Sequence, residues 1–272
     1  MENHTTTIEA GKSNRQYWND LWDYRELFYF LAWRDVLVRY KQTVIGIAWS
    51  VIRPVLTMVV FTVIFGNLAK FPSDGAPYPV MVFVAMLPWQ FFATALIACG
   101  DSVVGKSSMV SKIYFPRLII PVTAVSVSLV DFVVSFFILV ALMAWFQFVP
   151  GLAIIALPLF TIMIFALSLG IGLLFASLNV KYRDFKFIVP FMVQLGLYIS
   201  PVGFSSSVIP EKWRFIYSLN PVVGIIDGFR WAILGNPMYW PGFYVSLVVT
   251  IVSLTAGIMY FRKTEDDFAD VI

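Results

Sequence analysis

Long apolar runs separated by short polar stretches make up most of this chain of 272 residues. Six of the runs are long enough to cross a bilayer, because about 20 apolar residues in a helix cover the roughly 30 Å hydrocarbon layer. They comprise residues 44–68, 79–99, 118–148, 152–178, 187–204 and 243–261. None alternates with the period of two that marks a barrel strand, and in lipid a spanning helix satisfies its own backbone hydrogen bonds. The pattern therefore predicts an all-α polytopic membrane protein with six transmembrane helices.

The same pattern divides the chain into three parts. Residues 44–261 form the predicted six-span domain, between a cytoplasmic segment at 1–43 and a cytoplasmic tail at 262–272. Within the first segment, residues 17–41 mix aromatic and charged side chains, which suits an amphipathic helix lying in the headgroup layer. This helix either only anchors the chain, or it contacts the charged headgroup of a lipid substrate or a partner subunit.

The composition agrees with a membrane protein and removes several kinds of chemistry. Hydrophobic residues make up 60% of the chain and charged residues 13%, against about 25% charged in soluble domains. Cys99 is the single cysteine and His4 the single histidine. The sequence therefore excludes an internal disulfide, offers no metal-ligand set, so no metal is expected, and leaves no histidine outside the polar N-terminal tail for acid–base catalysis.

Lys and Arg residues indicate the orientation of the spans. If the N-terminus is cytoplasmic, fourteen of the nineteen Lys and Arg residues fall on cytoplasmic segments, and Arg53 lies in or near the membrane. The outer segments then hold Lys70, Lys212, Arg214 and Arg230. The positive-inside rule thus places both termini in the cytoplasm.

One motif is misleading in this context. Residues 100–107 read GDSVVGKS, which matches the G-x-x-x-x-G-K-[ST] pattern of a phosphate-binding loop. Such a loop requires a buried strand before it and an α/β domain around it, whereas this one follows a membrane helix. We therefore predict a basic cytoplasmic connector at 101–117. This connector and the loop 179–186 are either the places where an external engine applies force or simple determinants of topology.

The outer segment 205–241 is long and not hydrophilic. It contains two short apolar pieces separated at Asn220 and Pro221, each too short to cross the membrane. We predict short helices that dip into the outer leaflet and return. Their aromatic rings, Trp213, Tyr217 and Trp231, either form an interfacial belt or line a path on which sugar rings stack.

Asp131 is the most costly residue within the predicted spans. It lies thirteen positions into the third span, where an ionised carboxylate costs roughly 2.5–3.5 kcal/mol on insertion scales. Two interpretations are open: a structural acid hydrogen-bonded near Ser128 and Ser135, or a proton-coupling group of a secondary transporter.

The fourth span carries a face of small residues. Positions four apart along this helix include Ala166, Ser168, Gly170, Gly172 and Ala176. Such faces permit close approach of helices in lipid. The pattern supports packing within one protomer or between protomers, without distinguishing the two.

Several short motifs, taken in order, resemble the membrane subunit of type 2 ABC exporters of polysaccharide. They are Arg39-Tyr40, Ile45-Gly46, Trp49, Pro54 and Phe65-Gly66 around the first span, LPW at 87–89, KIYFPR at 112–117, YRD at 182–184, SPV at 200–202 and LNP at 219–221. Together they cover essentially the whole chain. The family moves lipid-linked O-antigen, capsule or teichoic-acid polymers across the bacterial inner membrane.

The resemblance implies how such a protein works and with which partners. It implies a homodimeric channel that docks two nucleotide-binding ATPase subunits through the connector 101–117, with ATP and Mg²⁺ bound by those subunits and no cofactor in this chain. The implied cargo is an undecaprenyl-diphosphate-linked polysaccharide, most closely O-antigen, handled in contact with membrane lipid and without nucleic acid. The alternatives are a capsule or teichoic-acid exporter, or an ABC exporter of a drug or small lipid. A membrane transferase would need clustered acids or histidines, and the chain has no Asp-x-Asp motif.

The resemblance also suggests three groups of site residues. The residues expected to couple to the ATPase are Asp101, Lys112, Tyr114, Phe115 and Arg117. Cations placed to meet the lipid diphosphate are Arg39, Lys41 and Arg53, since guanidinium and ammonium groups near the inner headgroups suit an anion. Aromatic residues proposed for the polysaccharide path and outer gate are Trp89, Tyr198, Trp213, Tyr217 and Trp231.

Overall fold

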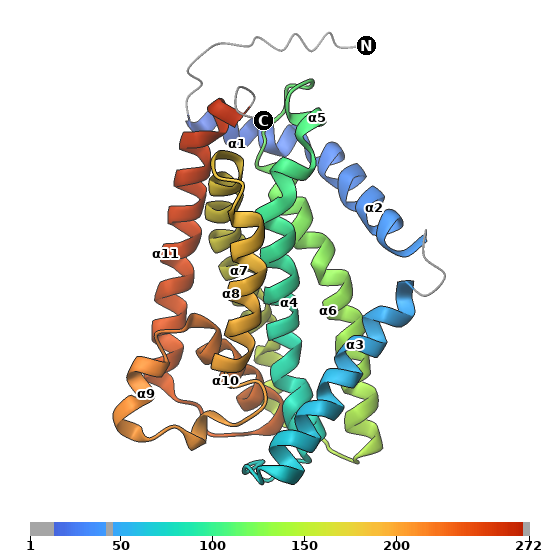
Figure 1. Ribbon diagram of the computed structural model, residues 1–272, viewed down its shortest axis with the longest axis vertical. Helices are drawn as coiled ribbons and strands as arrows, with labels where there is room; N and C mark the ends of the chain where they lie inside the picture. The colour runs from blue at the N-terminus through green and yellow to red at the C-terminus, as the bar shows by residue number, and fades with distance from the viewer. Residues whose placement is uncertain (1–13, 42–45, 269–272) are drawn as a thin grey trace.

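Within residues 14–41 and 46–268, which the computed structural model describes, the chain is helical and contains no strand (Figure 1). The prediction of an all-α protein is confirmed. The longer helices are α1 (Asn14–Asp23), α2 (Arg25–Lys41), α3 (Gly46–Phe61), α4 (Tyr78–Gly105), α6 (Ile119–Trp145), α7 (Leu157–Lys181), α8 (Phe185–Ile199), α10 (Pro221–Leu234) and α11 (Trp240–Thr264). Shorter pieces are η1 (Thr62–Leu68), α5 (Ser107–Val110), η2 (Leu152–Ala156), η3 (Ser206–Val208), α9 (Glu211–Tyr217) and η4 (Glu265–Asp267).

Five helical stretches in this part of the chain are long and apolar enough to cross a membrane. They are Ala48–Leu68, Tyr78–Gly105, Ile119–Trp145, Leu152–Lys181 and Trp240–Asp267. They coincide with the first four predicted spans and the sixth. The predicted fifth span, 187–204, overlaps α8, whose 15 residues cover about 22 Å along the axis. In Figure 1, α8 runs from the end of the bundle that carries α1 toward the end that carries α9 and α10. A count of six crossings stays a prediction.

Helix α4 forms the centre of the bundle. In an 18-residue apolar stretch of this helix 78% of the residues are buried, against 33% or less in the corresponding stretches of the other four spans. It packs against α6, α7, α3, α8 and α10. Its sequence is apolar on every side through most of its length, and a helix of this kind is stable where neighbours surround it. The core of the protein therefore forms around α4.

The small residues of the fourth span are used for packing inside the protomer. A Cβ atom on Gly170 of α7 would lie 2.5 Å from the backbone nitrogen of Leu254 in α11. One on Gly257 of α11 would lie 2.2 Å from the carbonyl oxygen of Gly170. On another face of α7, Gly172 packs against Cys99 of α4, and a Cβ atom on Gly172 would lie 2.6 Å from the Cys99 sulfur. The glycines let α7 approach both α11 and α4 closely.

The N-terminal segment forms two helices where a single interfacial helix was expected. Helices α1 and α2 are separated at Tyr24, and in Figure 1 α1 lies across the end of the bundle while α2 descends along α6. The Tyr17 hydroxyl donates a 2.9 Å hydrogen bond to Glu265, just after α11. The two ends of the described chain therefore meet at one end of the molecule.

At the opposite end, the outer segment forms α9 and α10 with a break at Asn220. The Asn220 side chain accepts a 3.1 Å hydrogen bond from the backbone N–H of Val222 and so caps α10. Helix α10 packs against α4, α7 and α11 and has buried residues along most of its length. The segment before α9 is also held in place, since Tyr78 donates to the Gly203 carbonyl at 2.6 Å. The two helices and their break are as expected, while their depth in a bilayer stays a prediction.

Candidate functional site

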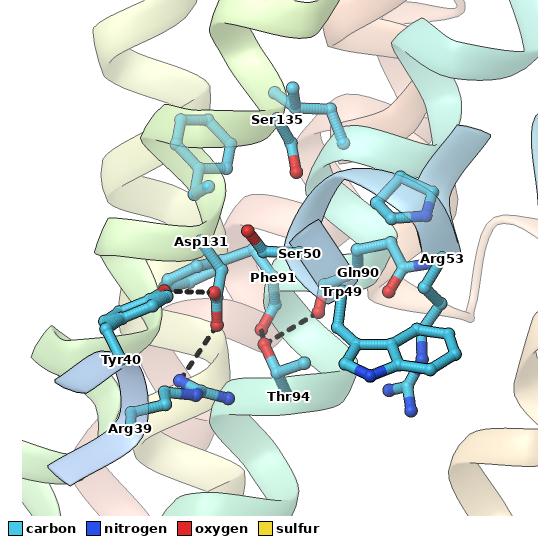
Figure 2. Close-up of a pocket in the computed structure, with 13 residues that line it drawn as sticks. Arg39, Tyr40, Trp49, Ser50, Arg53, Gln90, Phe91, Thr94, Asp131 and Ser135 are labelled. Carbon is cyan, nitrogen blue, oxygen red and sulfur yellow. Dashed lines mark hydrogen bonds and ion pairs between the residues drawn. The ribbon is translucent and has the colours of Figure 1, made fainter. Parts of the chain in front are cut away.

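A pocket of about 290 Å³ lies where the C-terminal end of α2 meets α3, α4 and α6 (Figure 2). Its polar and charged lining residues are Arg39 and Tyr40 of α2, Ser50 and Arg53 of α3, Gln90 and Thr94 of α4, and Asp131 and Ser135 of α6. Trp49 lines the same pocket one helical turn before Arg53, which places both side chains on one face of α3. Segments distant in the sequence thus build one polar site in an apolar bundle.

Asp131 is paired with the end of α2. Its Oδ2 lies 2.8 Å from Nη1 of Arg39, and its Oδ1 accepts a hydrogen bond from the Tyr40 hydroxyl. Ser128, expected to bond to this acid, donates to the carbonyl of Ala124 in its own helix. The carboxylate is paired with an arginine and a phenol from another helix, and the choice between a structural and a proton-coupling role stays a prediction.

Two of the three cations predicted to meet the lipid diphosphate line this pocket. Arg39 and Arg53 are both lining residues, whereas Lys41 is exposed outside it. Within residues 14–41 and 46–268, the Arg53 guanidinium makes no hydrogen bond or ion pair with the protein. The pocket therefore holds two guanidinium groups and one carboxylate. Guanidinium groups bind phosphate oxygens in a bidentate manner, so this arrangement suits an anionic ligand.

The sequence that resembles a phosphate-binding loop does not form one. Residues 100–105 are the last turns of α4, and Lys106 Nζ lies 2.5 Å from Oδ2 of Asp35 in α2. Arg34 bonds to the same carboxylate at 2.8 Å. Burial of Asp35 opposes its ionisation, but the hydrogen bonds from Lys106 and Arg34 outweigh it and lower its pKa. The lysine of the motif therefore ties α2 to the end of α4.

The five residues expected to couple to an ATPase occupy different environments in the connector. Phe115 is 4% exposed and packs with the apolar cluster that includes Leu31 and Val103. Tyr114 is 52% exposed and Ile113 59%. Lys112 is exposed, Asp101 lies in the last turns of α4 and Arg117 is half-buried. The connector thus presents an exposed tip on a base that is packed into the protein.

The five aromatic residues assigned to the polysaccharide path are not brought together. Trp89 is 4% exposed, and its ring packs against Gly196 of α8, where a Cβ would lie 2.7 Å away. Trp231 packs edge-on against Trp240 inside the protomer. Tyr198 and Trp213 are exposed, and Tyr217 donates to the Ile199 carbonyl at 2.9 Å. Only the end of α8 and helix α9 therefore present aromatic rings of this set to the outside.

The sequence pattern of the ABC-2 type transporter family matches residues 26–234. The chain belongs to this family. As an ABC-2 type transporter it is similar to the O-antigen export system permease protein RfbA of Klebsiella pneumoniae, with 25% identity over 248 residues, 91% of this chain and 95% of that protein. It is 25% identical over 257 residues to the RfbA of Myxococcus xanthus, which covers 93% and 98% of the two chains. The polysialic acid transport protein KpsM of Escherichia coli is 22% identical over 245 residues, 86% and 91% of the two chains.

Several residues that build the site were not singled out from the sequence of this ABC-2 type transporter. Tyr40 was noted only as part of a motif, and Gln90 and Thr94 gave no signal among the apolar residues of α4. Asp35 was one of several charges in the N-terminal segment. The signal in the sequence is the unusual position of Asp131, since a carboxylate at mid-span has to face protein or be neutral.

Replacing Lys106 with methionine is expected to lower the stability of the transporter without changing its affinity for nucleotide. The pKa of Asp35 is lowered in the folded protein, so the pair stabilises the fold above the ordinary carboxyl value of 3.8. That stabilisation, about 1 kcal/mol for a partly buried pair, is lost as the pH falls through the lowered pKa. Thermal unfolding should therefore separate the variant from the wild type at pH 7 and bring them together only below the lowered pKa of Asp35, which lies under 3.8. A loss of ATP binding by the complex would contradict this assignment.

Proposed function

We propose that two copies of this chain form the permease of an ATP-driven exporter of undecaprenyl-diphosphate-linked polysaccharide, of the O-antigen class. The observation that carries the proposal is the similarity, over almost the full length of both chains, to permeases named for O-antigen export. The more distant relative is named for transport of polysialic acid, also a polysaccharide. Cargo of this class therefore fits the relatives better than a drug or a small lipid.

The pocket at the end of α2 supports a lipid diphosphate as the part of the cargo that is recognised. Arg39 and Arg53 supply guanidinium groups from two helices, and Gln90 adds a neutral hydrogen-bonding side chain. Because Arg53 is exposed, a lipid headgroup approaching along α3 reaches it from the side. The site does not need to recognise the sugars in this arrangement, since the diphosphate is the same whichever undecaprenyl-diphosphate-linked polymer is bound.

The work of export is assigned to two ATPase subunits, which bind ATP and Mg²⁺, and no cofactor is assigned to this chain. We place their docking on the connector 101–117. Its exposed tip offers Lys112, Ile113 and Tyr114, while Phe115 anchors the base. Asn179, in the last turn of α7, donates to the Gly100 carbonyl at 3.1 Å, so a force on the connector also reaches α7.

Two neighbouring aromatic residues in the connector should affect different properties when changed to alanine. Tyr114→Ala is expected to weaken the binding of the ATPase subunit about 30-fold, or about 2 kcal/mol for an exposed aromatic contact, with the permease still folded. Phe115→Ala is expected to cost about 3 kcal/mol of stability because it empties a packed site. The measurements are the dissociation constant of the ATPase subunit and the thermal unfolding of the permease alone. If the ATPase subunit binds Tyr114→Ala and the wild type with equal affinity, the tip of the connector is not part of the interface.

The second copy is placed against α3 and α8. Both helices pack on the central α4 and expose apolar side chains, among them Leu56, Val60, Phe187, Phe191 and Leu195. Tyr198 of α8 and Trp213 of α9 are exposed at the outer end of the same region, where stacking on sugar rings suits a sliding polymer. The proposed orientation has both termini in the cytoplasm of a bacterium and the bundle in the inner membrane, because most Lys and Arg residues lie on that side.

Removal of the gene tests the function directly. Cells without it should accumulate undecaprenyl-diphosphate-linked polymer on the cytoplasmic side and lack it at the surface, and the gene carried on a plasmid should restore surface polymer. Reconstituted complexes separate the alternatives, because the ATPase rate should rise with carrier-linked O-antigen. Stimulation by capsule or teichoic-acid precursors, or by drugs or small lipids alone, would favour the corresponding alternative.

A further inference from the structure

We propose that Asp131 is an internal substitute for the ligand. Its carboxylate pairs with Arg39 while the pocket is empty, and the diphosphate of a polyprenyl-linked molecule displaces it. This inference rests on the proposed function and adds a second role to the site: the arrival of the headgroup breaks the ion pair that joins the end of α2 to α6.

The geometry of the pair is the first support. The Arg39 guanidinium meets Asp131 at 2.8 Å, and Tyr40 holds the other carboxylate oxygen (Figure 2). The side chain of Arg39 is 41% exposed and that of Asp131 is 23% exposed, so the pair sits at the wall of the open pocket. A phosphate oxygen carries the same charge and accepts the same hydrogen bonds as a carboxylate oxygen. A diphosphate can therefore replace Asp131 on Arg39 without leaving the guanidinium unpaired.

The charge balance of the pocket is the second support. The Arg53 guanidinium has no hydrogen-bond or ion-pair partner in the described part of the chain, whereas Arg39 is neutralised by Asp131. The carboxylate repels a diphosphate, so it weakens binding relative to a pocket with the two arginines alone. A carboxylate in the middle of a membrane helix is costly, and a purely structural tie between α2 and α6 needs no charge. An exporter, in contrast, has to release its cargo, and a competing internal anion speeds that release.

Helix α2 connects this exchange to the connector. Asp35 lies one turn before Arg39 on α2, and its Oδ2 is 2.5 Å from Nζ of Lys106, the C-cap residue of α4. Two ion pairs from neighbouring turns of α2 thus hold the pocket wall and the start of the connector. When Arg39 changes partner, the ion pair between α2 and α6 is lost and only the Tyr40 hydrogen bond still joins Asp131 to α2, so α2 is less firmly held at its link to the connector. Binding in the pocket therefore affects, through α2, the connector on which the ATPase is proposed to dock.

Binding of a short prenyl diphosphate tests the proposal. The permease–ATPase complex is placed in nanodiscs of phosphatidylethanolamine and phosphatidylglycerol, and titrated calorimetrically with farnesyl diphosphate. Asp131→Asn should bind it about tenfold more tightly than wild type, and the same variant should export polymer more slowly. Asp131→Glu, which keeps the anion, should retain wild-type affinity. Asp74→Asn, an acid on the loop before α4 at the opposite end of the bundle, is the control and should change neither quantity.

The outcomes separate this inference from the proposed function. If Arg39→Gln and Arg53→Gln weaken binding but Asp131→Asn binds equally or less well, Asp131 is only structural and the exchange is refuted. If neither arginine variant changes the affinity, the headgroup site itself is wrong. Inorganic pyrophosphate and farnesyl monophosphate are the remaining arms, and both should bind more weakly than farnesyl diphosphate. Equal binding of inorganic pyrophosphate would assign the pocket to a free anion and overturn the lipid ligand.

Discussion

Alanine at Gly257 should leave too little folded protein for export. The added Cβ would lie 2.2 Å from the carbonyl oxygen of Gly170, and both contacting groups belong to helix backbones that cannot rotate away. Helices α7 and α11 would have to separate along a contact that extends over much of their length. Overpacking a well-filled site costs about 1–3 kcal/mol and more where backbone must move, so we expect a loss of about 3 kcal/mol or more.

Gly100→Ala is the matched control for this substitution. Gly100 is also a buried glycine inside a long helix, but its Cβ would lie 3.5 Å from the Phe175 Cβ, an ordinary contact. Alanine is the better helix former by about 1 kcal/mol, so this variant should unfold at the wild-type temperature or slightly above. Size-exclusion chromatography and thermal unfolding in detergent measure the folded state and the stability of the two variants. Equal unfolding temperatures for Gly257→Ala and Gly100→Ala would show that α7 and α11 are not in such close contact.

Reversing the charge of Arg53 should abolish export while the complex still assembles and hydrolyses ATP. In Arg53→Glu the pocket would hold two carboxylates and one guanidinium, so a diphosphate would meet net repulsion instead of attraction. A hydrogen bond to a charged group contributes about 1.5–3 kcal/mol, which corresponds to roughly a 10- to 100-fold loss, and the reversed charge adds to this. Arg53 is exposed, so its replacement leaves the packing of α3 intact.

Two further variants define the role of this charge. Arg53→Lys should retain part of the export, because a lysine keeps the charge but loses the bidentate geometry. Arg25→Glu, at the far end of α2, should export normally, since Arg25 bonds only to the nearby Trp22 carbonyl at 3.4 Å among the contacts described. Surface polymer in cells and ATPase activity of the purified complex are the two readouts. Normal export by Arg53→Glu would place the headgroup elsewhere.

The connector shows how a local pattern and a fold can disagree. GDSVVGKS satisfies the phosphate-loop pattern in every letter, yet its first six residues form the end of α4. The segment before it is an apolar helix that continues without a break, so its glycines adopt helical backbone and do not surround a ligand. Lys106 then has Asp35 as its counter-ion. The sequence context therefore predicts correctly that this motif is not a phosphate-binding loop, whereas the pairing of Lys106 with Asp35 depends on how α2 packs on the end of α4.

The sequence by itself determined the helical class, the positions of the long apolar helices and the family. These follow from local properties: apolar length, the absence of a period-two pattern, and motifs in a fixed order. The breaks in the outer segment were also predictable, because Asn220 and Pro221 act on their own neighbours. The boundaries of α4 and α8 differ from the predicted spans, since hydropathy does not record where a helix gains or loses neighbours.

Only the tertiary structure decided which polar residues face one another. Asp131 was recognised as unusual, but its pairing with Arg39 and Tyr40 joins positions about 90 residues apart, and no periodicity encodes such a contact. The small residues of α7 were likewise compatible with two kinds of packing until Gly170 met Gly257. A hydrophobic pattern fixes which residues leave water or enter lipid, whereas the partner of a buried charge or a glycine depends on how the helices cross.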